Sequence, residues 1–450
     1  MLMRKKLLIV SFFFVTCVNA KQHDFQSMLA CHASSNEPGL AVRIEQSGEL
    51  IFSGAIGIAD IKSRDPLKVE HIFQIGSVTK QFTAAAILQL WENNKLSLQN
   101  TLGDFILGIP SEYSMLTIES VLSHTSGLPN YNTDARVRQQ WGKFKPINEV
   151  ITSVSKMPLL AEPGSAYLYS NTGYLLLGKV IEVASGLTYS GYLQQHIFSP
   201  LGMVNSFVIT DGETTDKIVK GYTAASRNPS ENSNPEVVDR SWIYAAGAVA
   251  STLKDMSRWH QALISGKVIS AENYQLMTTK AKLNTGETVN YGFGFDVYPI
   301  SNQPSYSHQG QVPGFMAWSI YFPKSDLFAT AFSNKDTVHP GPALLDLIAR
   351  QLRFSPAPIT NESIAERAKA LIGKYKGSDD TVMTVTFDNG QLYAKSGKGD
   401  TRKLLFRENN SFSYECTEDY FELRDVLGKQ LLVPVSIYSG EQAPLVRVEI

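Results

Sequence analysis

Strand-like segments occur at both ends of the first part of this chain, and helical patterns lie between them. Residues 39–60 contain two alternating runs, Leu40–Glu45 and Leu50–Ala55, on either side of a turn at Ser47-Gly48. Strand character returns at 291–334. Because strands must pair to satisfy their backbone groups, this order predicts an antiparallel sheet assembled from both ends. A helical insertion over that sheet gives an α+β fold.

A helix is predicted from Ser77 to about Asn93, directly after a turn of small residues. Its segment Ala84–Leu90 is apolar on nearly every side, which indicates a buried central helix. Ser77 and Lys80 are three residues apart, so they share one face near the helix N-terminus, where free N–H groups favour negative charge. A hydroxyl beside an amine is a known arrangement for an activated serine nucleophile.

The Ser-x-x-Lys spacing alone is weak evidence, because Ser153/Lys156 and Ser251/Lys254 share it. A helix-capping serine followed by a solvated lysine explains such a pair without any catalysis. Ser251 begins a predicted helix, so the capping interpretation is preferred there. The assignment of Ser77 therefore depends on residues elsewhere in the chain.

Tyr169 and Asn171 form a second motif. They are two residues apart in a loop that is expected to be extended, so their side chains point the same way. A tyrosine can serve as a base if a nearby lysine cation lowers its pKa. Asn171 can hydrogen-bond both Lys80 and a substrate amide or carbonyl. The alternative is a core tyrosine followed by an asparagine that starts the next helix.

The third motif, His308-Gln-Gly-Gln311, lies on a predicted strand, with His308 and Gly310 on one face. Gly310 would allow a substrate to lie against this strand as an added strand. The backbone N–H of Gln311 could then join that of Ser77 as an oxyanion hole. A structural histidine at a strand edge is the alternative.

In their order, flanks and spacing, the three motifs resemble those of serine β-lactamases and penicillin-binding proteins. The branch they resemble most contains class C β-lactamases, D,D-carboxypeptidases, D-stereospecific aminopeptidases and related esterases. The resemblance covers about residues 39–352. Further matching segments are Ser123-His-Thr-Ser-Gly-Leu-Pro129, Glu162-Pro-Gly164, Pro200-Leu-Gly-Met203, Ala246-Gly247 and Val312-Pro-Gly-Phe315.

The resemblance implies that Ser77 is the acylated nucleophile, and that Lys80 and Tyr169 share its deprotonation and protonate the leaving group. It implies that Asn171 orients Lys80 and the substrate. His308 stands where many β-lactamases carry a lysine, a fixed cation for a substrate carboxylate, whereas histidine is largely neutral at pH 7. This difference fits the peptidase and esterase members at least as well as the β-lactamases.

The expected function is therefore that of a serine hydrolase that forms an acyl-enzyme, without a cofactor. Its partner would be a small molecule or short peptide: a D-amino-acid peptide, a β-lactam or a small ester. A non-catalytic peptidoglycan- or peptide-binding protein that uses the same pocket is the alternative, and the complete Ser/Lys/Tyr set argues against it. Specificity is expected to lie in loops such as 130–146 and 210–239.

The charge balance argues against nucleic acid as a partner, because 41 basic residues face 42 acidic ones and no basic tract stands out. The eight histidines are scattered, and no Cys/His cluster has the spacing of a zinc site. The sequence therefore predicts no metal.

Residues 1–20 have the pattern of a signal peptide. Arg4–Lys6 are basic, Leu7–Val18 is a short apolar run, and cleavage is expected after Ala20. An uncleaved membrane anchor is the alternative. The mature protein is expected to be secreted or periplasmic, with no later apolar run long enough for a transmembrane helix. In an oxidising compartment Cys31 and Cys416 could pair, although the sequence alone does not bring them close.

Three segments follow the signal peptide. The hydrolase domain is expected at 21–354, and a linker with a short helix at 355–372. Residues 373–450 alternate at period two, with a strong hairpin signal at Asn389-Gly390. They are expected to form an all-β domain, and they loosely resemble the lipocalin-like barrels that often follow this hydrolase domain.

Overall fold

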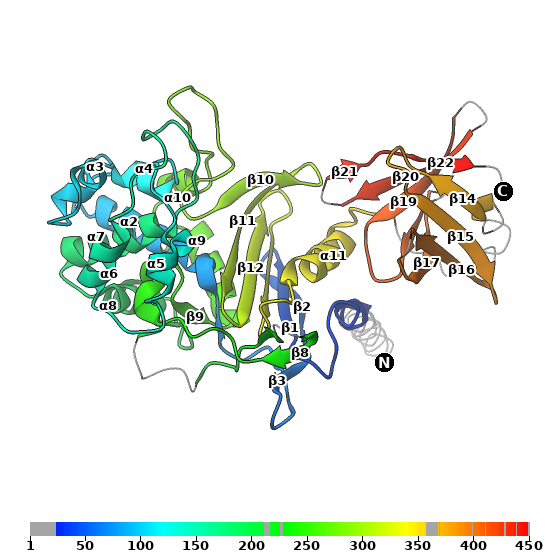
Figure 1. The fold of residues 1–450 in the computed structure, drawn as a ribbon, viewed down its shortest axis with the longest axis horizontal. Helices are drawn as coiled ribbons and strands as arrows, with labels where there is room; N and C mark the ends of the chain where they lie inside the picture. The colour runs from blue at the N-terminus through cyan, green and yellow to red at the C-terminus, as the bar shows by residue number, and fades with distance from the viewer. Residues whose placement is uncertain are drawn as a thin grey trace, which may run out of the picture. The chain divides into compact units, whose positions relative to one another are not determined.

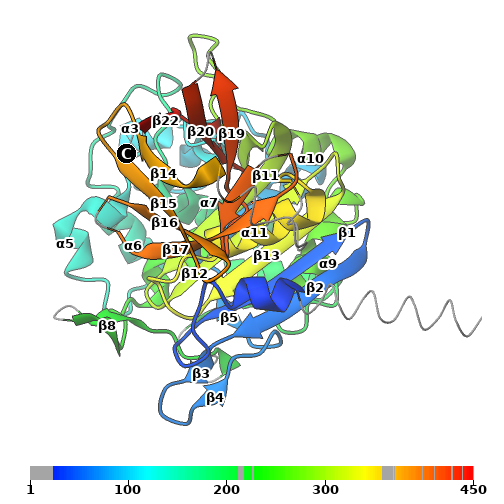
Figure 2. The same ribbon diagram turned by 90° about the vertical axis from the view of Figure 1, so that its right-hand side faces the viewer.

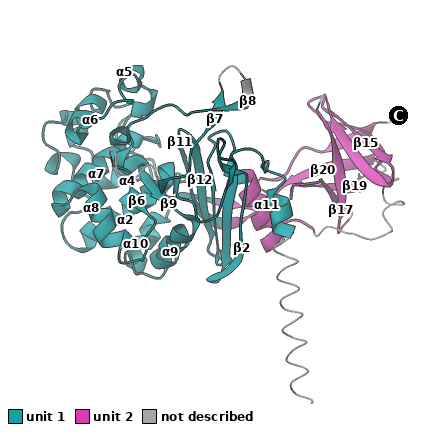
Figure 3. Cartoon of the chain, turned by 90° about the horizontal axis from the view of Figure 1, so that it is seen from below, with its two compact units in different colours: residues 1–298, 304–341 teal, residues 299–303, 342–450 magenta. Residues whose placement is uncertain are grey.

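The computed structural model describes residues 24–210, 217–225, 228–356, 368, 370–397, 399–409, 411–426, 429–437 and 439–448. The expected signal peptide and most of the expected linker lie outside these residues. The chain forms two compact units (Figure 3). Unit 1 comprises Met1–Tyr298 and Pro304–Gly341, and unit 2 comprises Pro299–Gln303 and Pro342–Ile450.

A six-stranded sheet combines strands from near both ends of residues 40–333, in the order β10-β11-β12-β13-β1-β2. The strand β1 pairs with β13 in antiparallel register, with Leu40 opposite Ser333 (Figure 2). The predicted assembly of the sheet from both ends is therefore confirmed. The strands are β1 (Leu40–Gln46), β2 (Glu49–Ile56), β10 (Asp296–Ile300), β11 (Gln303–Val312), β12 (Phe315–Phe322) and β13 (Leu327–Ser333).

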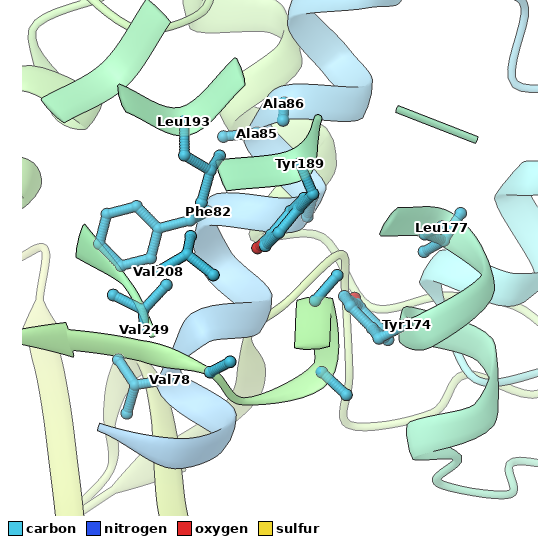
Figure 4. Packing of buried hydrophobic residues seen from close by; sticks show 14 of the residues in the cluster. Val78, Phe82, Ala85, Ala86, Tyr174, Leu177, Tyr189, Leu193, Val208 and Val249 are labelled. Atoms are coloured by element: carbon cyan, nitrogen blue, oxygen red, sulfur yellow. The ribbon is translucent and has the colours of Figure 1, made fainter. Parts of the chain in front are cut away.

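The helix that carries the first motif is buried at the centre of the helical region of unit 1 (Figures 1 and 4). A short 3-10 turn, η1 (Gly76–Val78), leads into α2 (Thr79–Glu92). Phe82 packs its ring 4.1 Å from that of Trp259, between centroids. The small side chains of Ala84–Ala86 let neighbouring elements approach closely, and all three are fully buried. The prediction of a buried central helix is confirmed.

Several helices surround α2, and α7 is the one that delivers the second motif. It begins at Asn171 and ends before Gly186, whose φ of 75° is the left-handed conformation that glycine favours at a helix end. The helices are α3 (Ser111–Ser114), α4 (Ile118–Leu122), α5 (Ala135–Arg138), α6 (Ile147–Val154), α7 (Asn171–Ser185), α8 (Tyr189–Leu193), α9 (Leu253–Ile264) and α10 (Ala271–Met277). Among the residues that the structure describes, no helix combines the length and apolar character needed to cross a membrane.

A small second sheet holds the turn that carries Ser77. Its strands are β5 (Phe73–Gln74), β9 (Val249–Ser251) and β6 (Phe207–Val208), with β9 in the middle. The N–H of Ile75 donates to the Val249 carbonyl at 3.1 Å, and the N–H of Val249 donates to Thr79 Oγ1 at 3.1 Å. The backbone on each side of Ser77 is thereby anchored to one strand, which fixes the direction of the Ser77 side chain.

Unit 2 contains an antiparallel barrel that follows the helix α11 (Pro340–Leu352). Its strands lie in the order β19-β18-β17-β16-β15-β14-β22-β20, and the pairing of β19 with β20 closes the ring of eight (Figure 1). The strands are β14 (Gly373–Lys376), β15 (Val382–Asp388), β16 (Gln391–Ser396), β17 (Thr401–Arg407), β18 (Ser411–Tyr414), β19 (Tyr420–Val426), β20 (Lys429–Ser436) and β22 (Leu445–Val448), with β21 (Gly440–Glu441) added beside β20. The all-β prediction for the C-terminal part is confirmed.

Glu418 is the centre of a buried ion cluster in unit 2. Its carboxylate accepts hydrogen bonds from Arg407 Nη1 at 2.8 Å and Arg350 Nε at 2.9 Å, and the Ser355 hydroxyl also donates to it. Burial alone would raise the pKa of Glu418. The hydrogen bond and charge of Arg407, together with the charge of Arg350, outweigh burial and lower that pKa.

Replacing Glu418 by glutamine is expected to reduce the free energy of unfolding by about 3–5 kcal/mol, because Arg407 would stay buried without its counter-ion. Because the folded-state pKa is lowered, the stabilisation is present above the unfolded-state pKa and is lost as the pH falls through the folded-state value. The difference between the two proteins should therefore shrink in acid. Urea titrations followed by circular dichroism measure both effects.

The matched control is Glu415→Gln, which breaks an exposed ion pair with Lys403 (3.2 Å). Exposed pairs contribute at most about 1 kcal/mol, so this variant should unfold close to the wild type. Equal losses in the two variants would show that burial of the Glu418 cluster has no special effect.

Candidate active site

Three sequence-predicted residues meet at the start of α2. Lys80 Nζ lies 3.0 Å from Ser77 Oγ and donates to Asn171 Oδ1 at 2.7 Å. A third neighbour, the backbone carbonyl of Ala246, accepts from Lys80 Nζ at 2.7 Å. The Lys80 side chain is fully buried. The amine is thus enclosed by one hydroxyl and two acceptors.

Two of these partners fix the direction of their hydrogen bonds with Lys80. Asn171 Oδ1 and the Ala246 carbonyl can only accept, so they take two N–H groups from Lys80. The third contact, with Ser77 Oγ, can be made by a third N–H of the ammonium, or by the lone pair of a neutral amine that accepts the Ser77 hydroxyl hydrogen. Burial lowers the pKa of Lys80 well below its usual value, which favours this neutral form. The geometry therefore allows Lys80 to act as a base toward Ser77.

The second motif is held in place by the segment that precedes α7. Ser170 caps α7 by accepting from the Gly173 N–H at 3.3 Å, and its hydroxyl donates to the Pro129 carbonyl at 2.8 Å. The Ser170 N–H donates to His124 Nδ1 at 3.1 Å. These bonds on the residue between Tyr169 and Asn171 fix the directions of both side chains.

The Tyr169 ring centre lies 5.0 Å from Lys80 Nζ, and its hydroxyl is close enough to the Ser77 side chain to interact with it. Burial raises the pKa of Tyr169, and the interaction with Ser77 offsets only part of that effect. The condition under which Tyr169 could be a base, a lowered pKa, is therefore not met. Tyr169 is a neutral phenol, a hydrogen-bond and proton donor.

His308 lies on β11, as predicted for the third motif, and is buried. Its Nδ1 is 2.6 Å from the Gln309 carbonyl, which can only accept, so Nδ1 carries the hydrogen. Nε2 then accepts from the Tyr291 hydroxyl at 3.0 Å. Burial, assisted by the charge of Lys80, lowers the pKa of His308 to about 3. His308 is therefore a neutral group that cannot replace the cationic lysine of many β-lactamases.

Gly310 lies where β11 approaches the turn that carries Ser77. A β-carbon at Gly310 would lie 1.9 Å from the Ile75 carbonyl oxygen and 3.0 Å from the Ser77 backbone nitrogen. One at Gly76, whose φ is +51°, would lie 2.7 Å from the backbone nitrogen of Gln311. The two glycines thus allow the backbones of Ser77 and Gln311 to approach each other, as an oxyanion hole made from their N–H groups requires. Gly310 is therefore needed so that β11 can pack against the turn at Ile75–Ser77. The sequence had suggested a different reason, the close approach of a substrate.

A group of aromatic rings behind Tyr169 was missed from the sequence. The His124 ring centre lies 4.4 Å from that of Tyr169, 5.1 Å from Tyr174 and 4.7 Å from Tyr291. Asp296 is close enough to influence these groups electrostatically, and burial raises its pKa to about 7. His124 lies in the family-like segment 123–129, which could have indicated that it belongs to the site. No motif in the sequence points to Tyr291.

The Ser77 side of this site opens into a pocket of about 110 Å³. Asn171 and Gln311 line it together with Ser77. Other lining residues come from the two loops in which specificity was expected, among them Tyr131 and Trp141 from the first loop and Glu236 from the second. The Ala246 carbonyl, the loop residues and Tyr291 are parts of the site that motif spacing did not identify.

An antiparallel sheet with a helical region beside it, and a serine, lysine and tyrosine that meet at the start of a buried helix, are the features of β-lactamase-like proteins. Comparison with family models agrees. The β-lactamase family model matches residues 25–353, and the chain therefore belongs to the β-lactamase family. This is the serine hydrolase family that includes penicillin-binding proteins and D-aminopeptidases.

Individual relatives support the assignment. Penicillin-binding protein 4* of Bacillus subtilis is 29% identical over 416 residues, which cover 86% of this chain and 90% of the relative. A D-aminopeptidase of Brucella anthropi is 27% identical over 282 residues, covering 62% of this chain and 52% of that protein. Among solved structures, the D-amino acid amidase of Ochrobactrum anthropi SV3 aligns with a TM-score of 0.62 at 24% identity, covering 73% of this chain and 97% of that one. This last comparison supports the fold.

Proposed function

We propose that this protein is a serine hydrolase that forms an acyl-enzyme on Ser77. The observation that carries the proposal is the fully buried Lys80 amine, 3.0 Å from Ser77 Oγ, with its other two contacts made to acceptors. As Ser77 Oγ attacks the substrate carbonyl, Lys80 takes the hydroxyl proton. The carbonyl oxygen becomes an oxyanion, which the N–H groups of Ser77 and Gln311 stabilise.

Collapse of this intermediate breaks the bond to the leaving group. Tyr169, a neutral phenol beside Ser77, gives its proton to the departing nitrogen or oxygen, and the proton on Lys80 replaces it. Water then attacks the acyl-enzyme ester by the same proton path in reverse, which releases the acid and restores Ser77. At the end of the cycle Ser77, Lys80 and Tyr169 have regained their original protons.

The substrates that we propose are D-amino acid amides or short peptides containing D-residues. Relatives named D-aminopeptidase and D-amino acid amidase support this class. The neutral His308 supports it as well, because the site lacks the lysine that provides a fixed cation for a carboxylate in many β-lactamases. The signal-like pattern of residues 1–20 leads us to place this activity outside the cytoplasm, in a secreted or periplasmic protein.

The test is a panel of substrates assayed side by side: D-phenylalanine amide, L-phenylalanine amide, nitrocefin and p-nitrophenyl acetate. We expect the D-amide to be hydrolysed with a kcat/KM at least about tenfold above its L-enantiomer and above nitrocefin, as a shaped polar site can discriminate. Protein carrying Ser77→Ala provides the background. Turnover of nitrocefin faster than the D-amide by orders of magnitude would overturn the proposed substrate class.

A further inference from the structure

The pocket beside Ser77 has an acidic character that the catalytic groups do not explain. Among the described residues that line it, Glu236 is the one side chain with a formal charge, and none is lysine, arginine or histidine. The other lining groups are aromatic, amide or apolar, such as Tyr131, Asn132 and Val312. A ligand in this pocket therefore meets a carboxylate and no counter-charge.

Glu236 is an exposed residue whose side chain contacts the loop at 130–146. The Trp141 indole N–H donates to Glu236 Oε1 at 2.9 Å. Three residues along, the Asp239 N–H donates to the Trp141 backbone carbonyl at 2.7 Å. Trp141 thus binds the Glu236 segment through its side chain and its backbone. The indole occupies one carboxylate oxygen with a single hydrogen bond, which leaves acceptor capacity on the group.

Arg138 and Lys80 contact other groups. The Arg138 guanidinium lies 5.0 Å from the centre of the Trp141 ring, and Arg138 does not line the pocket. Lys80 donates to Asn171 and Ala246. A carboxylate in a pocket that aromatic side chains also line is a suitable site for an ammonium group, which can form an ion pair there and gain from nearby ring faces. A substrate carboxylate in the same place would be repelled.

We propose that Glu236, oriented by Trp141, binds an ammonium group on the acyl side of the scissile bond. This inference rests on the proposed hydrolase function and specifies its substrates. The enzyme would act on aminoacyl amides and peptides with a free amine, as an aminopeptidase or amidase, and would discriminate against substrates that are recognised through a carboxylate. Glu236 is then the residue that determines specificity, while Ser77, Lys80 and Tyr169 perform the chemistry.

The test compares kcat/KM for D-phenylalanine amide and N-acetyl-D-phenylalanine amide, which share the scissile bond but differ in the ammonium group. We expect the wild type to prefer the free amine by about tenfold or more, the range of a hydrogen bond between charged groups. In Glu236→Gln this preference should fall to near one. N-acetyl-D-lysine amide distinguishes an α-ammonium from a side-chain ammonium, because only the latter remains available in that compound.

The matched control is Glu287→Gln, which removes an exposed carboxylate that does not line the pocket and should keep the wild-type preference. If the wild type hydrolyses these amides but Glu236→Gln keeps the full preference for every ammonium-bearing substrate, the assignment of Glu236 is wrong and the hydrolase function stands. If the wild type hydrolyses none of the amides or esters, the proposed function fails, and the role of Glu236 fails with it.

Discussion

Replacing Ser77 by alanine is expected to abolish labelling of the protein by a fluorophosphonate probe and to lower kcat for ester and amide hydrolysis by roughly 10⁴-fold or more. The reason is that Ser77 Oγ is the atom that would form the covalent bond. Without it, Lys80 has no hydroxyl to deprotonate and Tyr169 has no partner at the reacting atom. Residual activity would come from binding and the oxyanion hole alone.

The chain contains a matched control for this experiment. Ser153 and Lys156 have the same Ser-x-x-Lys spacing, but Ser153 lies half-buried on α6 and its hydroxyl donates to the Glu149 carbonyl at 2.8 Å. Ser153→Ala should therefore label and turn over like the wild type. Equal labelling of the wild type and Ser77→Ala, or no labelling of the wild type, would rule out the acyl-enzyme mechanism.

The fold could be predicted largely because its hairpins are encoded locally. Ser47 and Gly48 have φ values of 52° and 77°, and Asn389 and Gly390 have 48° and 80°. Positive φ at both central residues is typical of tight two-residue hairpin turns, in which Asn and Gly are favoured. These turns set the register of β1 with β2 and of β15 with β16, so alternating residues reach the correct faces. Boundaries between units have no comparable local signal.

The site was predictable only where its chemistry resides in side chains arranged in motifs. Ser77, Lys80, Tyr169 and Asn171 could be found because their motifs, in order and flanking residues, resemble those of a known family. The third partner of Lys80 is a backbone carbonyl at Ala246, and any residue type provides a carbonyl. The segment Ala246-Gly247 was among those that resemble the family, but the resemblance assigned it no role. The buried environments that raise the pKa of Tyr169 and lower that of His308 depend on tertiary packing, which spacing does not reveal.

The contacts inside the pocket could not be predicted from the sequence either. Specificity was expected to lie in the loops 130–146 and 210–239, and described residues of both loops line the pocket. The hydrogen bond between Trp141 and Glu236 joins residues far apart in the chain, and neither belongs to a recognisable motif. Part of the second loop also forms a two-stranded ribbon, β7 (Thr223–Ala225) with β8 (Asn228–Ser233), despite its polar sequence. Which loop residue meets which substrate group is decided by such tertiary contacts.

Replacing Lys80 by arginine, another long basic side chain, is expected to lower the rate of Ser77 acylation by about 10³-fold. An arginine guanidinium stays protonated at any pH that a protein tolerates, so it cannot accept the proton of Ser77. Lys80→Met, which removes the amine but keeps an unbranched side chain, should lose a similar factor. If Lys80 served only as a fixed cation, arginine would retain much of the activity and methionine would not.

The pH profile gives an independent check on the same assignment. Because burial lowers the pKa of Lys80, its neutral form should be present well below the pH at which a solvated lysine titrates. Acylation by a fluorophosphonate should therefore rise with pH along a limb set by the lowered pKa of Lys80. Burial raises the pKa of Tyr169, so no loss of its phenol proton should depress the rate at moderately alkaline pH.

Circular dichroism of the Lys80→Arg and Lys80→Met proteins tests whether each buried substitution leaves the fold intact. If a folded Lys80→Arg protein acylates at the wild-type rate, Lys80 is not the base, and another group must accept the proton of Ser77.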